Sequence, residues 1–330
     1  MVTEYRFKSQ EIESQIPNLV SKNITEFSIH DEALAKDKRR VLKILGLLEQ
    51  HAPFVFVSFL IDASILDREV INAASKIYIS FDIPLRCTSK GGKILFDKKF
   101  YANKARLLNE SGIVFGFMLF YAVDECDTLK AFMERLDFAV QQYPNHIDFP
   151  QLENTEREDF EAKVTGLFSA KDIRYSREVS FACKTFYSFG RAVPWFLAVL
   201  KPLRLYPSKF FADFAEWQRC NNCDFKSGYT PEKENHLDIE KMQILFTNEK
   251  YEEKSKNEYI VLVDDIIRVN GAMSRVVAEN METVMETSYN PDDLFSPEVL
   301  DLESFMENVC MEHCKIKIFA GGEGPDFIVQ

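Results

Sequence analysis

Residues 1–152 alternate between short apolar runs and stretches in which apolar residues recur at helical spacing. The apolar runs have the length and continuity of strands buried on both faces, and they cover residues 24–29, 53–61, 77–83, 113–121 and 146–149. The stretches between them predict helices because their apolar residues lie three and four positions apart, as do Val41, Ile44, Leu45 and Leu48.

This order predicts one helix, then five strands that alternate with four more helices. The first helix has one apolar face, made of Ile12, Ile16, Leu19 and Val20, and Pro17 should kink or shorten it. Strands separated by helices of this length imply crossover units and a parallel sheet. A parallel sheet normally begins with a strand, so we expect the first strand to be missing or to be supplied from outside this chain.

The pattern changes after residue 152. Residues 153–161 are strongly acidic, and from Glu178 the spacing is helical almost to the end. Expected helices cover residues 178–200, 208–219, 237–253, 259–286 (broken at Gly271) and 297–310. The predicted architecture is therefore α/β, with a parallel sheet in residues 1–152 and a mainly α-helical C-terminal domain in residues 153–330.

Composition and charge exclude several classes of function. The net charge of −12 argues against nucleic acid and against an anionic membrane surface, because both need clustered cations. The longest apolar stretch, Ala192 to Leu200, is much shorter than a membrane span, and Met1 to Glu13 has no apolar segment of signal type. The 7 cysteines are irregularly spaced, which favours reduced thiols. We expect a cytoplasmic protein.

Polar residues follow several expected strands, where parallel barrels bind their ligands. His30 and Asp31 end the first strand of the chain, Asp82 and Arg86 flank the end of the third, and Asp148 ends the fifth. These five residues are the candidate cofactor-binding residues. Two simpler interpretations stay open: His30 and Asp31 cap the next helix, and Asp82 pairs with Arg86.

Two pairs of cysteines have the spacing of metal ligands. Cys220 and Cys223 form a C-x2-C pair, and Cys310 and Cys314 form a C-x3-C pair. Two such pairs can hold zinc. The second spacing fits zinc less well, so ordinary reduced cysteines are the favoured interpretation and we assign no metal site.

Segments along most of the chain resemble radical S-adenosylmethionine proteins of the cobalamin-associated type, which are similar to magnesium-protoporphyrin cyclases and oxygen-independent coproporphyrinogen oxidases. Glu26-Phe27-Ser28-Ile29-His30-Asp31 resembles the second barrel strand and its loop, and residues 60–73 resemble the third strand and helix. The longest match is 98–150, where Pro144-Asn145-His146-Ile147-Asp148 resembles the start of the sixth strand. Residues 191–196 and 206–211 resemble the family's helical extension.

The resemblance implies that residues 1–152 form an incomplete parallel (β/α) barrel that lacks its first strand and cluster loop. It also implies S-adenosylmethionine, a 4Fe-4S cluster and often cobalamin, used for radical modification or methyl transfer. The cluster needs three thiolates spaced C-x3-C-x2-C. The first cysteine here is Cys87, so we expect no cluster on this chain alone and place cobalamin in a missing N-terminal domain. The family's Tyr-Gly-x-Pro turn reads Tyr121-Ala122-Val123-Asp124.

Two hypotheses about function follow. In the first, the chain is the C-terminal part of a split or truncated radical enzyme and is inactive alone. Its partner is an N-terminal cobalamin and radical S-adenosylmethionine fragment, or a second copy joined through the open sheet edge. In the second, the chain is a degenerate, non-catalytic family member that binds a small molecule or a protein.

Overall fold

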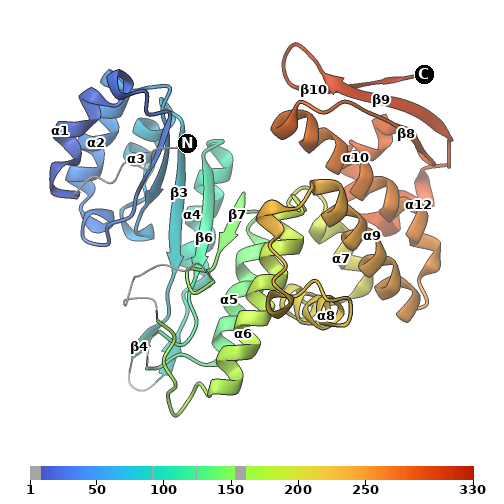
Figure 1. Cartoon of the computed structure of the whole chain (residues 1–330), viewed down its shortest axis with the longest axis horizontal. Coiled ribbons are helices and arrows are strands. Elements are labelled where there is room, and N and C mark those ends of the chain that lie inside the picture. Colours follow the sequence, from blue (N-terminus) through green and yellow to red (C-terminus); the bar gives the residue numbers. More distant parts are fainter. Residues whose placement is uncertain (1–8, 91–92, 124, 153–160) are drawn as a thin grey trace. The chain divides into compact units, whose positions relative to one another are not determined.

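A computed structural model of the chain describes residues 9–90, 93–123, 125–152 and 161–330. The expected loop at Gly91-Gly92, Asp124 and residues 153–160 of the acidic segment lie outside the described residues. The chain forms two compact units, Met1–Ile173 (unit 1) and Arg174–Gln330 (unit 2) (Figure 1). The division lies later in the chain than residue 152.

Unit 1 contains an all-parallel sheet of five strands that follow the order of the chain. The strands are β1 (Glu26–Ile29), β2 (Phe56–Leu60), β3 (Ile79–Leu85), β6 (Val114–Leu119) and β7 (His146–Asp148). The helices between them are α2 (Lys38–His51), α3 (Arg68–Ala74), α4 (Lys98–Glu110) and α5 (Leu129–Gln141). The predicted five strands and four intervening helices are confirmed. Because crossovers of this type are right-handed, strands in chain order place all four helices on one face of the sheet.

The two faces of this sheet differ in polarity. Residues that pair across neighbouring strands form a row, and their side chains point to the same face of the sheet. Side chains in successive rows point to opposite faces. One set of rows carries large buried apolar residues, among them Val57, Phe59, Phe81, Phe115, Phe117 and Ile147. The other set carries small and polar residues, among them Ser28, Ser58, Ser80, Asp82, Gly116, His146 and Asp148. The apolar face is the one that helices cover. The opposite face carries these polar residues beside the buried apolar residues Leu60 and Met118, and is called the polar face below.

The ends of the helices in unit 1 follow from capping side chains. The side chains of Asp37, Asp67, Asp97 and Thr128 accept hydrogen bonds from the first backbone N–H groups of α2, α3, α4 and α5, respectively. At the N-terminus, α1 (Ile12–Gln15) gives way to a 3-10 turn (Ile16–Asn18) that contains Pro17, as expected.

One local expectation for unit 1 is wrong, and one local element was not predicted. Val20 is 58% exposed and does not belong to the buried face, because the helix ends before it and short 3-10 turns follow. A hairpin of β4 (Thr88–Lys90) and β5 (Lys93–Leu95) lies between β3 and α4. These three-residue strands are too short to give a recognisable alternation in the sequence.

Unit 2 combines helices with a small antiparallel sheet. Its main helices are α6 (Ala170–Cys183), which begins in unit 1, then α7 (Phe196–Leu203), α8 (Pro207–Cys220), α9 (His236–Glu253) and α10 (Ile260–Glu279). A π-helical turn (Lys184–Phe189) follows α6, so the expected single helix over 178–200 is divided. The short helices α11 (Pro291–Leu294) and α12 (Leu302–Asn308) follow β8.

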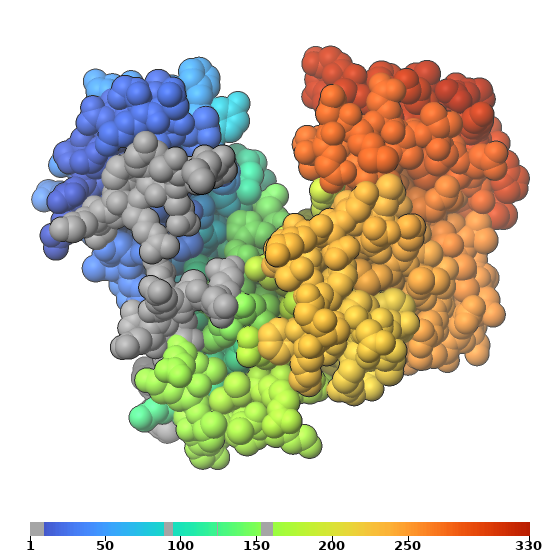
Figure 2. Space-filling model, in the orientation of Figure 1, coloured from blue at the N-terminus to red at the C-terminus, as the bar shows by residue number. Residues whose placement is uncertain are grey.

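The expectation of helices almost to the end of the chain is wrong. Strands β8 (Thr283–Thr287), β9 (Cys314–Ala320) and β10 (Pro325–Val329) form an antiparallel sheet that packs on α10 and appears red at the surface of unit 2 in Figure 2. α10 runs unbroken through Gly271 and ends where Asn280 adopts φ 51°. Burial in β9 alternates as in a strand with one covered face, and Cys314, Ile316 and Ile318 are its buried residues.

Aromatic residues fill the core of unit 2. Phe186, in the π-helical turn, is fully buried at the centre of this core. The distance from its ring centroid to those of its aromatic neighbours is 5.0–6.4 Å, and these neighbours are Trp195, Phe196, Phe210, Phe211, Phe214 and Phe246. Most of these contacts are edge-to-face, the arrangement that the ring quadrupoles favour. This cluster accounts for part of the high phenylalanine content.

A buried polar group connects α9 and α10 beside this core. Arg275 donates hydrogen bonds to Glu240 Oε2 at 2.5 Å and to His236 Nδ1 at 3.0 Å. Gly271 makes room for it, since a Cβ there would lie 1.9 Å from Glu240 Oε2. An imidazole that accepts a hydrogen bond from a guanidinium is neutral, and burial, followed by the charges of Arg191 and Arg275, lowers the pKa of His236 to about 4.

His236 therefore predicts a pH-dependent contribution to stability. The unfolded imidazole binds a proton near its ordinary pKa of about 6.5, and the folded one only near about 4. Between these two pKa values the unfolded state binds more protons than the folded state. The contribution of neutral His236 to the free energy of unfolding is therefore complete above the unfolded pKa and is lost as the pH falls toward the folded pKa. The loss should reach up to about 3 kcal/mol. Urea unfolding of the wild type and His236→Gln across this pH range measures it, and parallel pH profiles for the two proteins would contradict it.

Candidate functional site

Asp82 is the centre of a polar cluster on the sheet of unit 1. It lies in the middle of β3, not at the end of the strand as expected, and only 5% of its surface is exposed. Its register partners are Leu60 on β2 and Gly116 on β6, and Gly116 is in turn the partner of His146 on β7. The carboxylate therefore lies on the polar face of the sheet, in the central strand.

Three side chains from other strands and loops hold the carboxylate. Nε2 of His30, which follows β1, lies 3.0 Å from Asp82 Oδ2, and Nε2 of His146 lies 2.9 Å from Oδ1. The hydroxyl of Ser58 on β2 donates to Oδ2 at 2.5 Å. Each carboxylate oxygen thus accepts a hydrogen bond from an imidazole, which a buried charge needs.

Gly116 allows His146 to reach across β6 to β3. A Cβ at position 116 would lie 2.1 Å from both Cδ2 and Nε2 of His146, so the imidazole occupies the space of the missing side chain. The φ of Gly116 is not in the left-handed region, so this glycine is required for space and not for backbone conformation.

The electrostatics favour the charged forms of Asp82 and His146. Burial would raise the pKa of the Asp82 carboxyl, but the hydrogen bonds from His146, His30 and Ser58 together outweigh it and lower that pKa. Burial would likewise lower the pKa of His146, but the hydrogen bond to Asp82 and the charge of Asp148 raise it. The side chains of His30, His146 and Asp148 remain 30%, 28% and 32% exposed, so solvent reaches the cluster.

The structure brings together three of the five candidate residues. His30 contacts Asp82 directly, and Asp148 Oδ2 lies 3.3 Å from His146 Nε2. Asp31 lies in the turn after β1, where its Oδ1 accepts the N–H of Leu34 at 2.8 Å, and the next helix, α2, is capped by Asp37 instead.

The expected pairing of Asp82 with Arg86 is wrong. Arg86 forms an ion pair with Glu32, and its guanidinium lies 5.2 Å from the ring centroid of Phe120. β3 extends to Leu85, which puts the two residues four positions apart along one strand instead of at a shared end.

Sequence reasoning missed three members of the cluster, namely Ser58, Gly116 and His146. The signal for His146 was its position two residues before Asp148 in an expected strand, since side chains at that spacing share a face. A glycine inside the apolar run 113–121 was a second signal, because such a glycine often marks a close approach.

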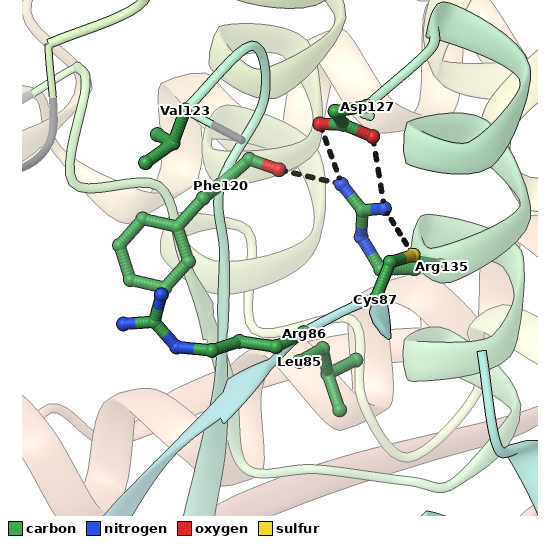
Figure 3. A pocket seen from close by; sticks show the side chains of 7 residues that line it. All are labelled: Leu85, Arg86, Cys87, Phe120, Val123, Asp127 and Arg135. Atoms are coloured by element: carbon green, nitrogen blue, oxygen red, sulfur yellow. Dashed lines mark hydrogen bonds and ion pairs between the residues drawn. The ribbon is translucent and has the colours of Figure 1, made fainter. Parts of the chain in front are cut away.

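A second polar group lies at the carboxyl ends of β3 and β6 and lines a hollow with room for about one water molecule. Buried Arg135 donates to both carboxylate oxygens of Asp127, at 3.1 and 3.0 Å, and to the carbonyl of Phe120 at 2.8 Å. Its guanidinium also contacts Cys87 Sγ at 2.8 Å, as Figure 3 shows. Burial raises the pKa of the Cys87 thiol, so this cysteine is not poised as a nucleophile.

Among the described residues, one group of three or more His, Cys, Asp or Glu side chains has its ligand atoms close enough for a metal ion: Asp82, His146 and Asp148. The four cysteines of the two spaced pairs are not part of any such group in the described chain. Cys220 and Cys310 are exposed, and Cys314 is buried in β9.

No family model and no curated protein matches this chain. Among the helices that the structure describes, none has the length and apolar character to cross a membrane. The chemistry of the site must therefore be argued from its geometry. It offers a buried anion, two imidazoles and a partly exposed second carboxylate on one face of a parallel sheet, which suits a cationic or hydrogen-bonding ligand.

The contact between Gly116 and His146 yields a test of the cluster. We expect Gly116→Ala to displace the imidazole from Asp82 and to lower the free energy of unfolding by about 1–3 kcal/mol, the cost of a lost charged hydrogen bond. In the His146→Ala background the same substitution should cost little, because no ring remains to be displaced. Urea unfolding of the four proteins gives the coupling energy.

Gly46→Ala is the matched control. Gly46 lies in α2, and a Cβ there would have no atom within 4 Å, so this variant should be neutral or slightly stabilising. Equal effects of Gly116→Ala in both backgrounds would show that His146 does not occupy the space beside Gly116.

Proposed function

We propose that this chain is the C-terminal part of a radical S-adenosylmethionine-type barrel, which binds its small-molecule ligand on the polar face of the sheet and needs a complementary segment for catalysis. The observation that carries the proposal is the sheet of unit 1. Its five parallel strands follow chain order, and one face is apolar and covered by helices while the other is polar. In a (β/α) barrel the face away from the helices lines the interior, so Asp82 and its partners would lie inside such a barrel.

The turn after β6 supports the same proposal. Ala122, which stands where the resembling family has glycine, has φ 54°, a conformation that glycine adopts without strain. Its N–H donates to Asp127 Oδ2 at 3.1 Å, and Arg135 holds both Asp127 and the carbonyl of Phe120. The turn thus keeps a glycine-type backbone without the glycine.

The sequence also supports the need for another segment. Three closely spaced thiolates hold a radical-type cluster and leave one iron open for S-adenosylmethionine. The sequence has no C-x3-C-x2-C motif. We therefore propose that a complementary segment, with a cobalamin domain where the enzyme uses one, supplies the cluster.

A second candidate function is a non-catalytic binding module of the same ancestry. The interactions that tie Asp82 to His30 and His146 favour it, because this chain alone contributes all the polar groups of the cluster. The reading frame upstream of this one separates the two candidates: a three-cysteine loop encoded there supports the split enzyme.

Both candidates predict weak binding of S-adenosylmethionine at the polar face. Asp82→Asn removes the buried negative charge beside the exposed imidazoles, so we expect it to weaken binding by about 1–3 kcal/mol, the value of a hydrogen bond to a charged group. Calorimetric titration in the presence of EDTA measures binding without a contribution from metal ions.

Glu110→Gln is the control, since Glu110 ends α4 and pairs with the exposed Arg106 away from the sheet. Its affinity should equal that of the wild type. Binding that survives Asp82→Asn but is lost in Cys220→Ser or Cys314→Ser would place the ligand in unit 2 and reject the polar face.

The edge strand β1 leads to a prediction about the partner. In the described part of the chain β1 pairs only with β2, and the carbonyl of Thr25 accepts the N–H of Phe56 at 2.9 Å. Since successive residues point their backbone groups in opposite directions, the N–H of Ser28 faces away from β2. We expect the chain to self-associate through this edge. Ser28→Pro removes a backbone N–H that faces away from β2, so it should reduce the association and leave the hydrogen bonds to β2 in place.

Sedimentation velocity over a range of concentrations measures the association. Phe27→Pro is the matched variant: Phe27 faces β2, so its substitution should destabilise unit 1 by about 1–3 kcal/mol. A wild-type chain that stays monomeric at every concentration would show that β1 is not an open edge.

A further inference from the structure

Two carboxylate oxygens converge on one nitrogen of His146. Nε2 lies 2.9 Å from Asp82 Oδ1 and 3.3 Å from Asp148 Oδ2. An imidazole nitrogen carries one hydrogen and can direct it well at one acceptor only. Two carboxylate oxygens thus face one imidazole nitrogen, and a cation between the three atoms would contact all of them.

The spacing of these atoms matches the edges of a metal coordination polyhedron. First-row transition ions hold imidazole nitrogen and carboxylate oxygen at about 2.0–2.2 Å, so adjacent ligand atoms lie about 3.0–3.5 Å apart in octahedral or tetrahedral sites. The two measured separations are close to that range, and all three ligand atoms lie within 4.8 Å of one another. Small side-chain movements would bring them to bonding distance.

The surroundings orient the central ligand. Asp82 Oδ1 faces His146, while its other oxygen, Oδ2, accepts hydrogen bonds from His30 at 3.0 Å and Ser58 at 2.5 Å. Such partners fix the orientation of a metal-bound carboxylate. Gly116 leaves the space in which the imidazole of His146 lies over β6.

We propose that Asp82, His146 and Asp148 bind a divalent transition-metal ion on the polar face of the sheet, with His30 and Ser58 as positioning residues. Two carboxylates and a neutral imidazole together carry two negative charges, which a divalent cation balances. One nitrogen and two oxygens suit manganese, iron(II) or zinc, and three protein ligands leave positions for water or a ligand. The inference goes beyond the proposed function and does not depend on S-adenosylmethionine.

Manganese(II) chloride is the probe, because thiolates bind manganese poorly and the seven cysteines will not compete for it. The full-length chain is freed of metal with a chelator, the chelator is removed, and binding is followed by calorimetry and by the electron paramagnetic resonance signal of free manganese. We expect one ion per chain. His146→Gln and Asp148→Asn should each weaken binding by about tenfold or more, and Ser58→Ala by about tenfold.

Two substitutions outside the cluster are the controls: His51→Gln at the end of α2 and Glu110→Gln at the end of α4 should bind as the wild type does. Asp148→Asn keeps the test valid if His146→Gln fails to fold, because Asp148 is partly exposed at the end of β7. A folded wild type that binds no manganese, or equal binding by wild type and Asp148→Asn, would overturn the inference. Loss of S-adenosylmethionine binding in EDTA would leave it intact.

Discussion

The arrangement of unit 1 depends on a carboxylate buried within a parallel sheet. A charge removed from water costs several kcal/mol unless hydrogen bonds and opposite charge compensate it. For Asp82 the compensation comes from His30 after β1, Ser58 on β2 and His146 on β7, so groups from across the sheet must meet at one point. A slip of β7 by one residue would turn His146 to the helix-covered face. The cluster therefore favours one register of the sheet as well as forming a candidate site.

Glycine at points of close approach is a feature that both units share. Gly116 admits the ring of His146 in unit 1, and in unit 2 Gly271 admits Glu240 while Gly190 lies against Gln243. A Cβ at any of these positions would lie about 2 Å from its neighbour, and none of the three has a positive φ. In this protein, buried polar side chains thus reach their partners where the opposing backbone carries no side chain.

The sequence predicted the framework of unit 1 because its signals are local. Apolar runs such as 53–61 mark buried strands, and apolar residues three and four positions apart, such as Val41, Ile44 and Leu45, mark helices. The sheet of unit 2 was missed because residues 283–287 follow α10 within a few positions and were taken as its continuation, although Asn280 ends the helix. The site was predicted in part: one-dimensional spacing located Asp82 and Asp148, but the partners His146 and Ser58 depend on register across β6 and β2, which no local pattern contains.

The turn at Ala122 shows how hydrogen bonds can hold a backbone conformation that costs energy. A left-handed conformation costs a non-glycine residue about 1 kcal/mol or more. Hydrogen bonds around the turn can offset this cost. Asp127 accepts the N–H of Ala122, and Arg135 on α5 binds both Asp127 and the carbonyl of Phe120, so both sides of the turn are tied to α5. A residue other than glycine is thus tolerated at this position because neighbouring hydrogen bonds compensate its conformational cost. The turn after β6 therefore keeps a left-handed backbone through contacts that unit 1 supplies itself, from Asp127 and Arg135.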